Sequence, residues 1–324
     1  MPHPSRSARL AVAVLLGAVV GALTALWIAH ITVPTDFEFW WRGAREWGAG
    51  GNPYLHARET AAWPLPDPLF YPLPALILTW PVSALPVSVA AGIFMGISTA
   101  ALGWALMRDG FWRLLILVHP GMVMAMRYGQ WSPLLMAGAL IPSAAFVLIA
   151  KPTLGVACFS YRPTWRGAAV AAVFGLASLA MWPSWPIWWL RNLHQAVGHP
   201  PPIATLLGVV IVLSLLRWRR SDARFLFVMA CVPQLLWFSD QLPLALIARN
   251  SREAVWLSIC AAIAFLLWIV RFGAIGGAAA VIGAEPYVIV GCYFPALVMV
   301  LMRPNVAGAE SELGARPRPV RTAR

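Results

Sequence analysis

The stretch Leu10–Ala29, LAVAVLLGAVVGALTALWIA, contains twenty residues without a charge. At 1.5 Å per residue, a helix of this length crosses a hydrocarbon core of about 30 Å. The run is long for the apolar part of a signal peptide, and no convincing small-x-small cleavage site follows it. We therefore expect a retained membrane anchor.

The composition extends this interpretation to the whole chain. Charged residues make up 11% and hydrophobic residues 60% of the 324 residues, against about 25% and 45–50% in soluble domains. This predicts an all-α, polytopic integral membrane protein. With the first run, about ten crossings are expected, the others near residues 87–107, 112–127, 131–160, 167–183, 203–217, 223–239, 241–250, 254–271 and 286–302.

Two of these spans are irregular. The segment 131–160 is too long and too rich in proline for one straight helix and is compatible with two half-helices, while 241–250 is shorter than a full span. Cys158, Cys231, Cys260 and Cys292 lie in or beside apolar runs without a CxxC motif or Cys/His spacing. They are interpreted as small core residues.

The net charge of +12 is carried mainly by arginines in short loops between the apolar runs. This is the positive-inside pattern rather than a nucleic-acid footprint, and it places both termini in the cytoplasm. We expect one transmembrane domain over 1–302 and a disordered basic cytoplasmic tail over 303–324. On the outer side, large loops are left over 32–86 and 182–202.

These outer loops are rich in aromatic residues. Apolar residues recur at helical spacing in the first loop, at Phe37, Trp40, Trp41, Ala44 and Trp47, which predicts an amphipathic helix lying at the membrane surface. A second apolar piece, 73–85, is too short to span. In the second loop an aromatic belt is expected from Trp182, Trp185, Trp188 and Trp189.

Asp36 precedes the predicted surface helix, in a chain with only 12 acidic residues. One interpretation is an N-cap that accepts a hydrogen bond from the first turn, with Glu38 favouring the positive end of the helix. The other is a general base in a partly desolvated cleft at the membrane surface. The two interpretations are compatible.

Lys151 is the only lysine among the 24 lysine and arginine residues, and it lies in the apolar stretch Phe146–Thr153. A lysine near an interface can extend its ammonium group to water. Alternatively, it binds the phosphate of an anionic lipid head group. If Asp36 and Lys151 serve one reaction, we expect both to face a shared outer cavity.

A polar turn, Arg127–Ser132, is explained equally by a simple loop or by Arg127 and Gln130 lining a polar site. His119 lies inside a predicted span and is interpreted as a core residue. His56, His194 and His199 match no metal motif, and neither a metal nor a cofactor is expected. Nucleotide-binding and serine-triad motifs are absent from the sequence.

Six motifs occur in order and together resemble the signature of glycosyltransferase family 87, which comprises polytopic enzymes of the GT-C fold. They are Thr35-Asp36-Phe37, Phe39-Trp40, Gly50-Gly51-Asn52-Pro53-Tyr54, Phe70-Tyr71-Pro72-Leu73-Pro74, Gly129-Gln130 and Lys151-Pro152-Thr153. The resemblance covers about residues 10–165. It implies transfer of a hexose, mannose being the commonest in the family, from a polyprenyl-phosphate donor to a lipid or glycan hydroxyl on the outer face of the plasma membrane.

The resemblance also implies roles for individual residues. Asp36 would be the catalytic base, and Lys151 would stabilise the leaving phosphate with Arg127 or Arg42 as helpers. Gln130, Tyr54, Tyr71 and His194 are expected to line the substrate pocket. Residues 130–151 are compressed relative to the family, and Tyr71-Pro72-Leu73-Pro74 departs from the usual Tyr-Pro-Pro. A catalytically inactive relative, or a lipid-sugar transporter, is the alternative.

Overall fold

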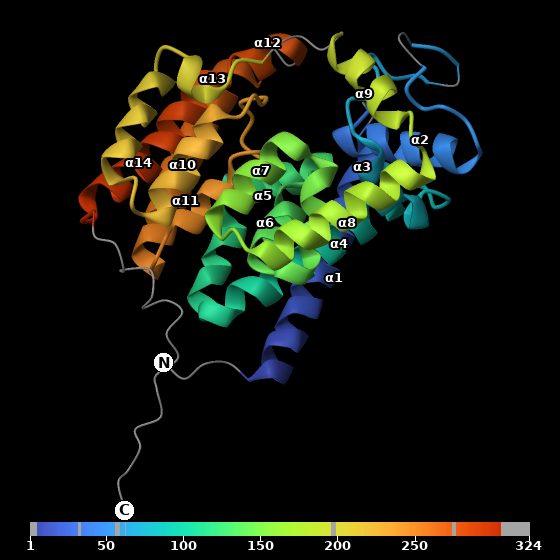
Figure 1. Cartoon of the computed structure of the whole chain (residues 1–324). Coiled ribbons are helices and arrows are strands. Elements are labelled where there is room, and N and C mark those ends of the chain that lie inside the picture. Colours follow the sequence, from blue (N-terminus) through green and yellow to red (C-terminus); the bar gives the residue numbers. More distant parts are fainter. Residues whose placement is uncertain are drawn as a thin grey trace, which may run out of the picture.

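The structure is a computed structural model that describes residues 5–31, 34–55, 59–61, 63–195, 199–273 and 277–305, apart from the side chains of 277 and 278. Within these residues every regular element is a helix, as predicted (Figure 1). The expected disordered tail, 303–324, lies outside the described residues from 306 onward. The longest helices are α1 (Arg6–His30), α4 (Val87–Leu106), α8 (Trp165–Met181) and α11 (Ser251–Phe272).

The first half of the chain adds α2 (Asp36–Gly48), α3 (Leu73–Thr79), η1 (Trp80–Val82), η2 (Met107–Asp109), η3 (Phe111–Val118), α5 (Pro120–Tyr128), α6 (Ser132–Leu140), η4 (Pro142–Ala150) and α7 (Pro152–Tyr161). The second half adds α9 (Trp185–Leu193), η5 (Pro202–Ala204), η6 (Gly208–Arg217), α10 (Ser221–Cys231), η7 (Leu242–Ile247), α12 (Gly277–Ile282), α13 (Glu285–Val288), η8 (Ile289–Tyr293) and α14 (Phe294–Met302). The elements η1 to η7 are 3-10 helices, and η8 is a π-helical turn.

Four helices in the described residues are long and apolar enough to cross a membrane: Arg6–His30, Val87–Asp109, Ser251–Phe272 and Ala279–Met302. Counting α8 and α9, which meet at a bend of 101°, as one broken span gives five. The expectation of about ten crossings is therefore not confirmed. The predicted spans 87–107 and 254–271 coincide with continuous helices, whereas most of the others fold as shorter pieces.

Prolines explain much of this fragmentation. The helices α5, α6, η4 and α7 each carry a proline in their first turn. Proline is tolerated there because its missing N–H would lack a helical partner in any case, but within a helix it removes a hydrogen bond. The break expected within 131–160 is confirmed, and the polar residues Gln130 and Lys151 lie at two of these interruptions.

Two glycine pairs bring α1 and α4 into close contact. A Cβ atom on Gly17 would lie 2.6 Å from the carbonyl oxygen of Gly96, and one on Gly21 would lie 2.7 Å from that of Gly92. Each helix thus presents a G-x-x-x-G face that lets the backbones approach, a packing mode common between membrane helices. Large apolar residues of α1, among them Leu15 and Leu26, remain exposed on its other side.

The prediction that α2 lies at the membrane surface through its aromatic face is wrong. Phe37, Trp40, Trp41 and Ala44 are buried within the protein. The ring of Trp40 lies 4.4 Å from that of Tyr71 and 5.6 Å from that of Trp131, and Phe37 lies 5.5 Å from Phe94. The helix is amphipathic as expected, but its apolar stripe packs on α3, α4 and the rings of Tyr71 and Trp131.

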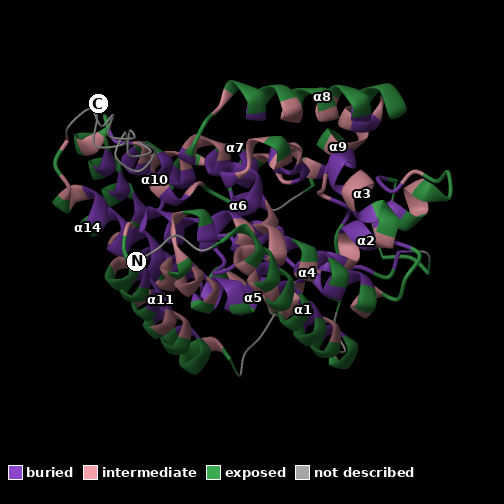
Figure 2. Cartoon of the chain, turned by 90° about the horizontal axis from the view of Figure 1, so that it is seen from below, coloured by how far each residue is buried: buried purple, intermediate pink, exposed green. Residues whose placement is uncertain are grey.

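The second outer loop also packs on protein. The helix α9 sits over the segment that leads into α3, since Trp189 Nε1 donates to the Phe70 oxygen and Asn192 Nδ2 to the Leu69 oxygen. Trp185 of the expected aromatic belt is buried. By contrast α8 buries only Gly167 and Ser178 and presents a largely exposed face (Figure 2).

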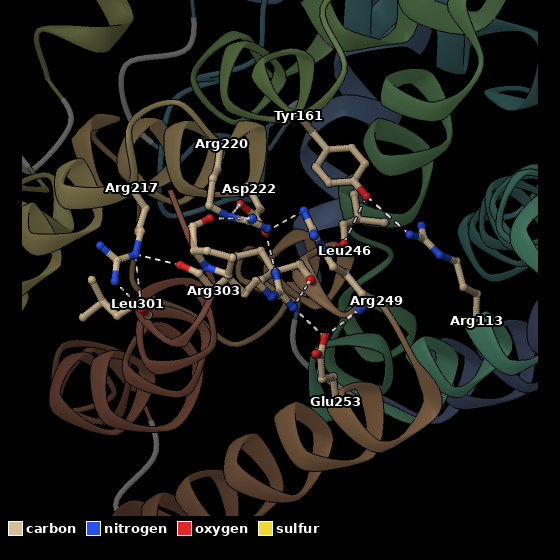
Figure 3. Close-up of polar contacts among 12 residues, drawn as sticks. Arg113, Tyr161, Arg217, Arg220, Asp222, Leu246, Arg249, Glu253, Leu301 and Arg303 are labelled. Carbon is tan, nitrogen blue, oxygen red and sulfur yellow. Dashed lines mark hydrogen bonds and ion pairs between the residues drawn. The ribbon is translucent and has the colours of Figure 1, made fainter. Parts of the chain in front are cut away.

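A network of charged side chains joins the starts of α10 and α11 to the end of α14 (Figure 3). We call it the arginine cluster: Arg220, Asp222, Arg249, Glu253 and Arg303. Arg220 donates to both Asp222 oxygens at 3.0 and 2.9 Å, Arg249 lies 3.3 Å from Asp222, and Arg303 bridges Asp222 and Glu253. These bonds fasten three helices together.

Candidate active site

Four polar side chains converge from separate interruptions in the helices. Asp36 begins α2, Gln130 lies between α5 and α6, Lys151 lies between η4 and α7, and Asp240 lies in the irregular segment between α10 and η7. We call these four residues the carboxylate-lysine cluster. None of them belongs to one of the four long apolar helices.

Asp36 is not the N-cap of α2, so the capping interpretation is wrong. Thr35 occupies the cap position, without a side-chain capping bond, and Asp36 is the first helical residue. Its Oδ2 accepts a hydrogen bond from Gln130 Nε2. Gly129 adopts a left-handed conformation, φ 68°, at the end of α5, and the turn that follows presents the buried Gln130 to α2.

Burial raises the pKa of Asp36 to about 6, and the negative charges of Asp240 and Asp67 act in the same direction. The positive charge of Lys151 and the hydrogen bond from Gln130 oppose this rise. Asp36 and Lys151, predicted to serve one site, therefore lie within electrostatic reach of each other. A carboxylate with a pKa near neutrality can exchange protons at physiological pH, which suits a general base.

Lys151 is paired with an acid that the sequence analysis missed. Its Nζ donates to both carboxylate oxygens of Asp240, at 2.7 and 2.8 Å. The Asp240 side chain is 6% exposed and that of Lys151 19%. The signal for Asp240 was present in the sequence, because it is an acid between two apolar runs, Leu235–Phe238 and Leu242–Ile247. The same reasoning singled out Lys151.

Tyr71 lies within electrostatic reach of the cluster. Its pKa is raised far above the ordinary value, first by burial and then by the charges of Asp36 and Asp240, so its phenol lies near both carboxylates. Tyr54 stands behind it, donating from its hydroxyl to the Tyr71 carbonyl oxygen at 3.0 Å. Tyr54 also packs its ring 5.8 Å from Trp182. Of the residues expected to line a pocket, Gln130 belongs to the cluster, Tyr71 interacts electrostatically with its two carboxylates, and Tyr54 bonds to the backbone of Tyr71.

The remaining three candidates lie elsewhere. Arg42 pairs with Glu38 on the same helix, with 2.7 Å between Nη2 and Oε1. Arg127 is exposed and its guanidinium stacks 5.5 Å from the ring centre of Trp27. His194 is exposed at the end of α9. Neither arginine is among the charges that shift the pKa of Asp36.

Within the part of the chain that the structure describes, several buried polar atoms close in sequence to the cluster have no hydrogen-bond partner. They are Gln130 Oε1, Thr35 Oγ1, Trp131 Nε1, Ser132 Oγ, Ser239 Oγ and Gln241 Oε1. Each belongs to one of the four residues or lies within two positions of one in the chain. Buried polar groups ordinarily find a partner in the protein, water or a ligand. This set offers both donors and acceptors, which is suitable for a ligand with several hydroxyl groups.

Two surface grooves lie away from the cluster. One is lined by Leu23, Leu26, Trp27, His30 and Ile31 along the end of α1. The other lies between the starts of η4 and α8 and is lined by Pro142, Ser143, Trp165, Arg166, Ala169 and Val170. Among the described residues, no group of three or more histidine, cysteine or acidic side chains is arranged to hold a metal ion.

Comparison of the chain with protein-family models, curated proteins and solved structures gives no match.

Proposed function

We propose that this protein is a membrane hexosyltransferase of the GT-C type, which transfers a hexose, mannose by family resemblance, from a polyprenyl-phosphate donor to a hydroxyl of a lipid or glycan acceptor. The observation that carries the proposal is the convergence of Asp36, with a pKa of about 6, and Lys151, the only lysine of the chain. A proton acceptor and a phosphate-binding cation are the two groups that such a transfer requires.

In this mechanism the acceptor oxygen attacks the anomeric carbon while its proton passes to an oxygen of Asp36. The bond between the anomeric carbon and the phosphate oxygen breaks, and its electrons remain on the departing polyprenyl phosphate. Attack from the side opposite the leaving group inverts the anomeric configuration. Gln130, bonded to Asp36, orients the base, and Lys151 stabilises the charge that develops on the phosphate.

The proposal places the site on the extracytoplasmic face of the plasma membrane, with both termini in the cytoplasm. The charge pattern of the sequence supports this side, because most of the arginines fall in the loops expected in the cytoplasm. A lipid-linked donor suits that location, because the sugar remains anchored in the membrane where nucleotide sugars are absent. Weaker spans formed by the broken helices would complete the GT-C architecture.

The test is transfer of radiolabelled mannose from polyprenyl-phosphate-mannose to a panel of lipid acceptors by the purified full chain in nanodiscs. Wild type is expected to form a labelled glycolipid, and Asp36→Asn is expected to lose this activity. Glu38→Gln is the matched control, because Glu38 lies on the same helix but pairs with Arg42. If Asp36→Asn transferred mannose at the rate of the wild type, Asp36 would not be the base.

A second candidate is a lipid-sugar carrier without chemistry, favoured by one observation. The four residues of the cluster lie where helices are interrupted, as ligand-binding residues of transporters do. A carrier would move labelled polyprenyl-phosphate-mannose across the membrane of proteoliposomes without releasing polyprenyl phosphate. Release of polyprenyl phosphate in proportion to labelled product distinguishes the transferase.

A further inference from the structure

In the proposed site, Lys151 forms its ion pair with Asp240 and not with the proposed base, Asp36. Among the described residues, Lys151 is the one cation whose charge shifts the pKa of Asp36, yet both of its hydrogen bonds go to Asp240. A lysine ammonium is a compact charge on a rotatable four-carbon stem and takes the partner that is offered. In the absence of Asp240, Asp36 would remain as a carboxylate within electrostatic reach of Lys151.

A direct ion pair with Lys151 would make Asp36 a poorer base. An adjacent cation stabilises the carboxylate and lowers its affinity for a proton. Asp240 opposes this in two ways: it binds the ammonium group, and its own negative charge raises the proton affinity of Asp36. Asp67, an exposed residue, adds a smaller effect in the same direction, and Gln130 opposes it.

We propose that Asp240 is a positioning residue, which holds the ammonium group of Lys151 apart from Asp36 so that one carboxylate stays free to accept a proton. This inference rests on the proposed transfer reaction. Asp240 does not touch the reacting atoms. As negative charge develops on the leaving phosphate, the three N–H donors of Lys151 are shared between Asp240 and the phosphate oxygens. The pair thus places a cation beside the leaving group without quenching the base.

The first test measures protonation directly and needs no substrate. Infrared spectra of the full chain in nanodiscs are titrated with pH, and the band of protonated Asp36 is identified by its disappearance in Asp36→Asn. In Asp240→Asn the midpoint of this band should move to lower pH by about one unit, because a negative charge is removed and Lys151 turns to Asp36. An unchanged midpoint overturns the positioning role, whatever the activity shows.

The second test uses the transfer assay. Asp240→Asn should lower kcat by 10- to 100-fold, with a smaller change in KM for the donor. It should also move the acidic limb of the pH profile of transfer to lower pH by about one unit. Asp240→Glu, which keeps the charge, should recover most of the activity. A loss of thermal stability without any change in the pH profile would mean that Asp240 is only structural.

A charge exchange separates position from pairing. The double variant Lys151→Asp with Asp240→Lys restores an ion pair but places the cation at position 240 instead of 151. We expect Asp240→Asn to lower the unfolding temperature, and the double variant should recover it while remaining inactive. Wild-type activity in the double variant would overturn the inference. If wild type transfers no sugar while the infrared midpoint shifts as expected, the proposed function fails and the electrostatic part of the inference stands.

Discussion

The molecule contains two buried charge clusters that are built in opposite ways. In the arginine cluster, Asp222 is contacted by three arginines, and the backbone is fastened as well: Arg220 binds the Pro304 oxygen and Arg217 binds those of Leu301 and Arg303. The carboxylate-lysine cluster has two carboxylates for one cation, and polar atoms without partners surround it. In Figure 1, α2, α3 and α9 lie at one edge of the molecule and the end of α14 at the other.

The pKa values follow from this difference. Burial alone would raise the pKa of Asp222, but the hydrogen bond from Arg220 and the charges of Arg303 and Arg249 lower it overall. Asp36 has too few cations to offset its burial, and its pKa rises to about 6. Fully satisfied polar networks stabilise a unique packing, whereas incompletely satisfied ones store free energy that a ligand can recover. This difference supports a structural role for the arginine cluster and the catalytic role that we propose for the carboxylate-lysine cluster.

The largest effect is expected on catalysis. Asp36→Asn should reduce transfer about 1,000-fold, a magnitude within the range for removal of a general base. The unfolding temperature should not fall, because the asparagine can keep a hydrogen bond to Gln130 and no longer carries a buried charge. Initial rates and thermal unfolding are measured on the same preparation. A fall in unfolding temperature as large as that of an arginine-cluster variant would erase the proposed difference between the clusters.

The next effect concerns stability. Asp222→Ala should lower the free energy of unfolding by about 3 kcal/mol, since it leaves buried arginines without their shared partner. Denaturation in mixed micelles measures this change, and Asp67→Ala, at an exposed aspartate, is the control. The transfer activity per folded molecule of Asp222→Ala should equal that of the wild type. A stable Asp222→Ala protein would show that the arginine bonds to backbone oxygens suffice to hold α14.

The two carboxylates should also respond oppositely to pH. Asp36 binds its proton more tightly when folded, so its ionisation destabilises the protein, and this contribution appears as pH rises from about 4 to above 6. Asp222 binds its proton less tightly when folded, so it contributes stability above pH 4 that is lost as pH falls through its lowered pKa. Between pH 4 and pH 7 the free energy of unfolding of the wild type should fall by about 2 kcal/mol relative to that of Asp36→Asn. A difference that does not change with pH would contradict the raised pKa.

The sequence predicted the features that depend on neighbouring residues better than those that depend on contacts between distant parts of the chain. Helical character and the uninterrupted spans α4 and α11 were evident locally, from the length and hydropathy of the runs. The interfacial position of α2 was predicted wrongly, because an amphipathic pattern shows which face is covered but not whether lipid or protein covers it. The G-x-x-x-G motifs of α1 and α4 are local sequence patterns that indicate close helix packing.

The candidate site shows the same limit. Asp36 and Lys151 could be singled out by their unusual positions in a chain poor in carboxylates and lysine. The pairing of each with its bonding partner could not be predicted, because Gln130 lies 94 residues from Asp36 and Asp240 lies 89 residues from Lys151. Such pairings depend on how broken helices assemble, which local periodicity does not encode. A rule that flags every charged residue between apolar runs would have found Asp240.

The smallest effect is expected at the cations outside the cluster, and it marks the boundary of the site. Arg127→Gln should keep transfer within about threefold of wild type, because its guanidinium is exposed over Trp27 and does not act on Asp36. Lys151→Gln should lose about 100-fold, a magnitude within the range for removal of one group that stabilises developing charge. Initial rates at saturating donor measure both. Equal losses in the two variants would extend the phosphate site to the end of α5 and weaken the assignment of Lys151 as its cation.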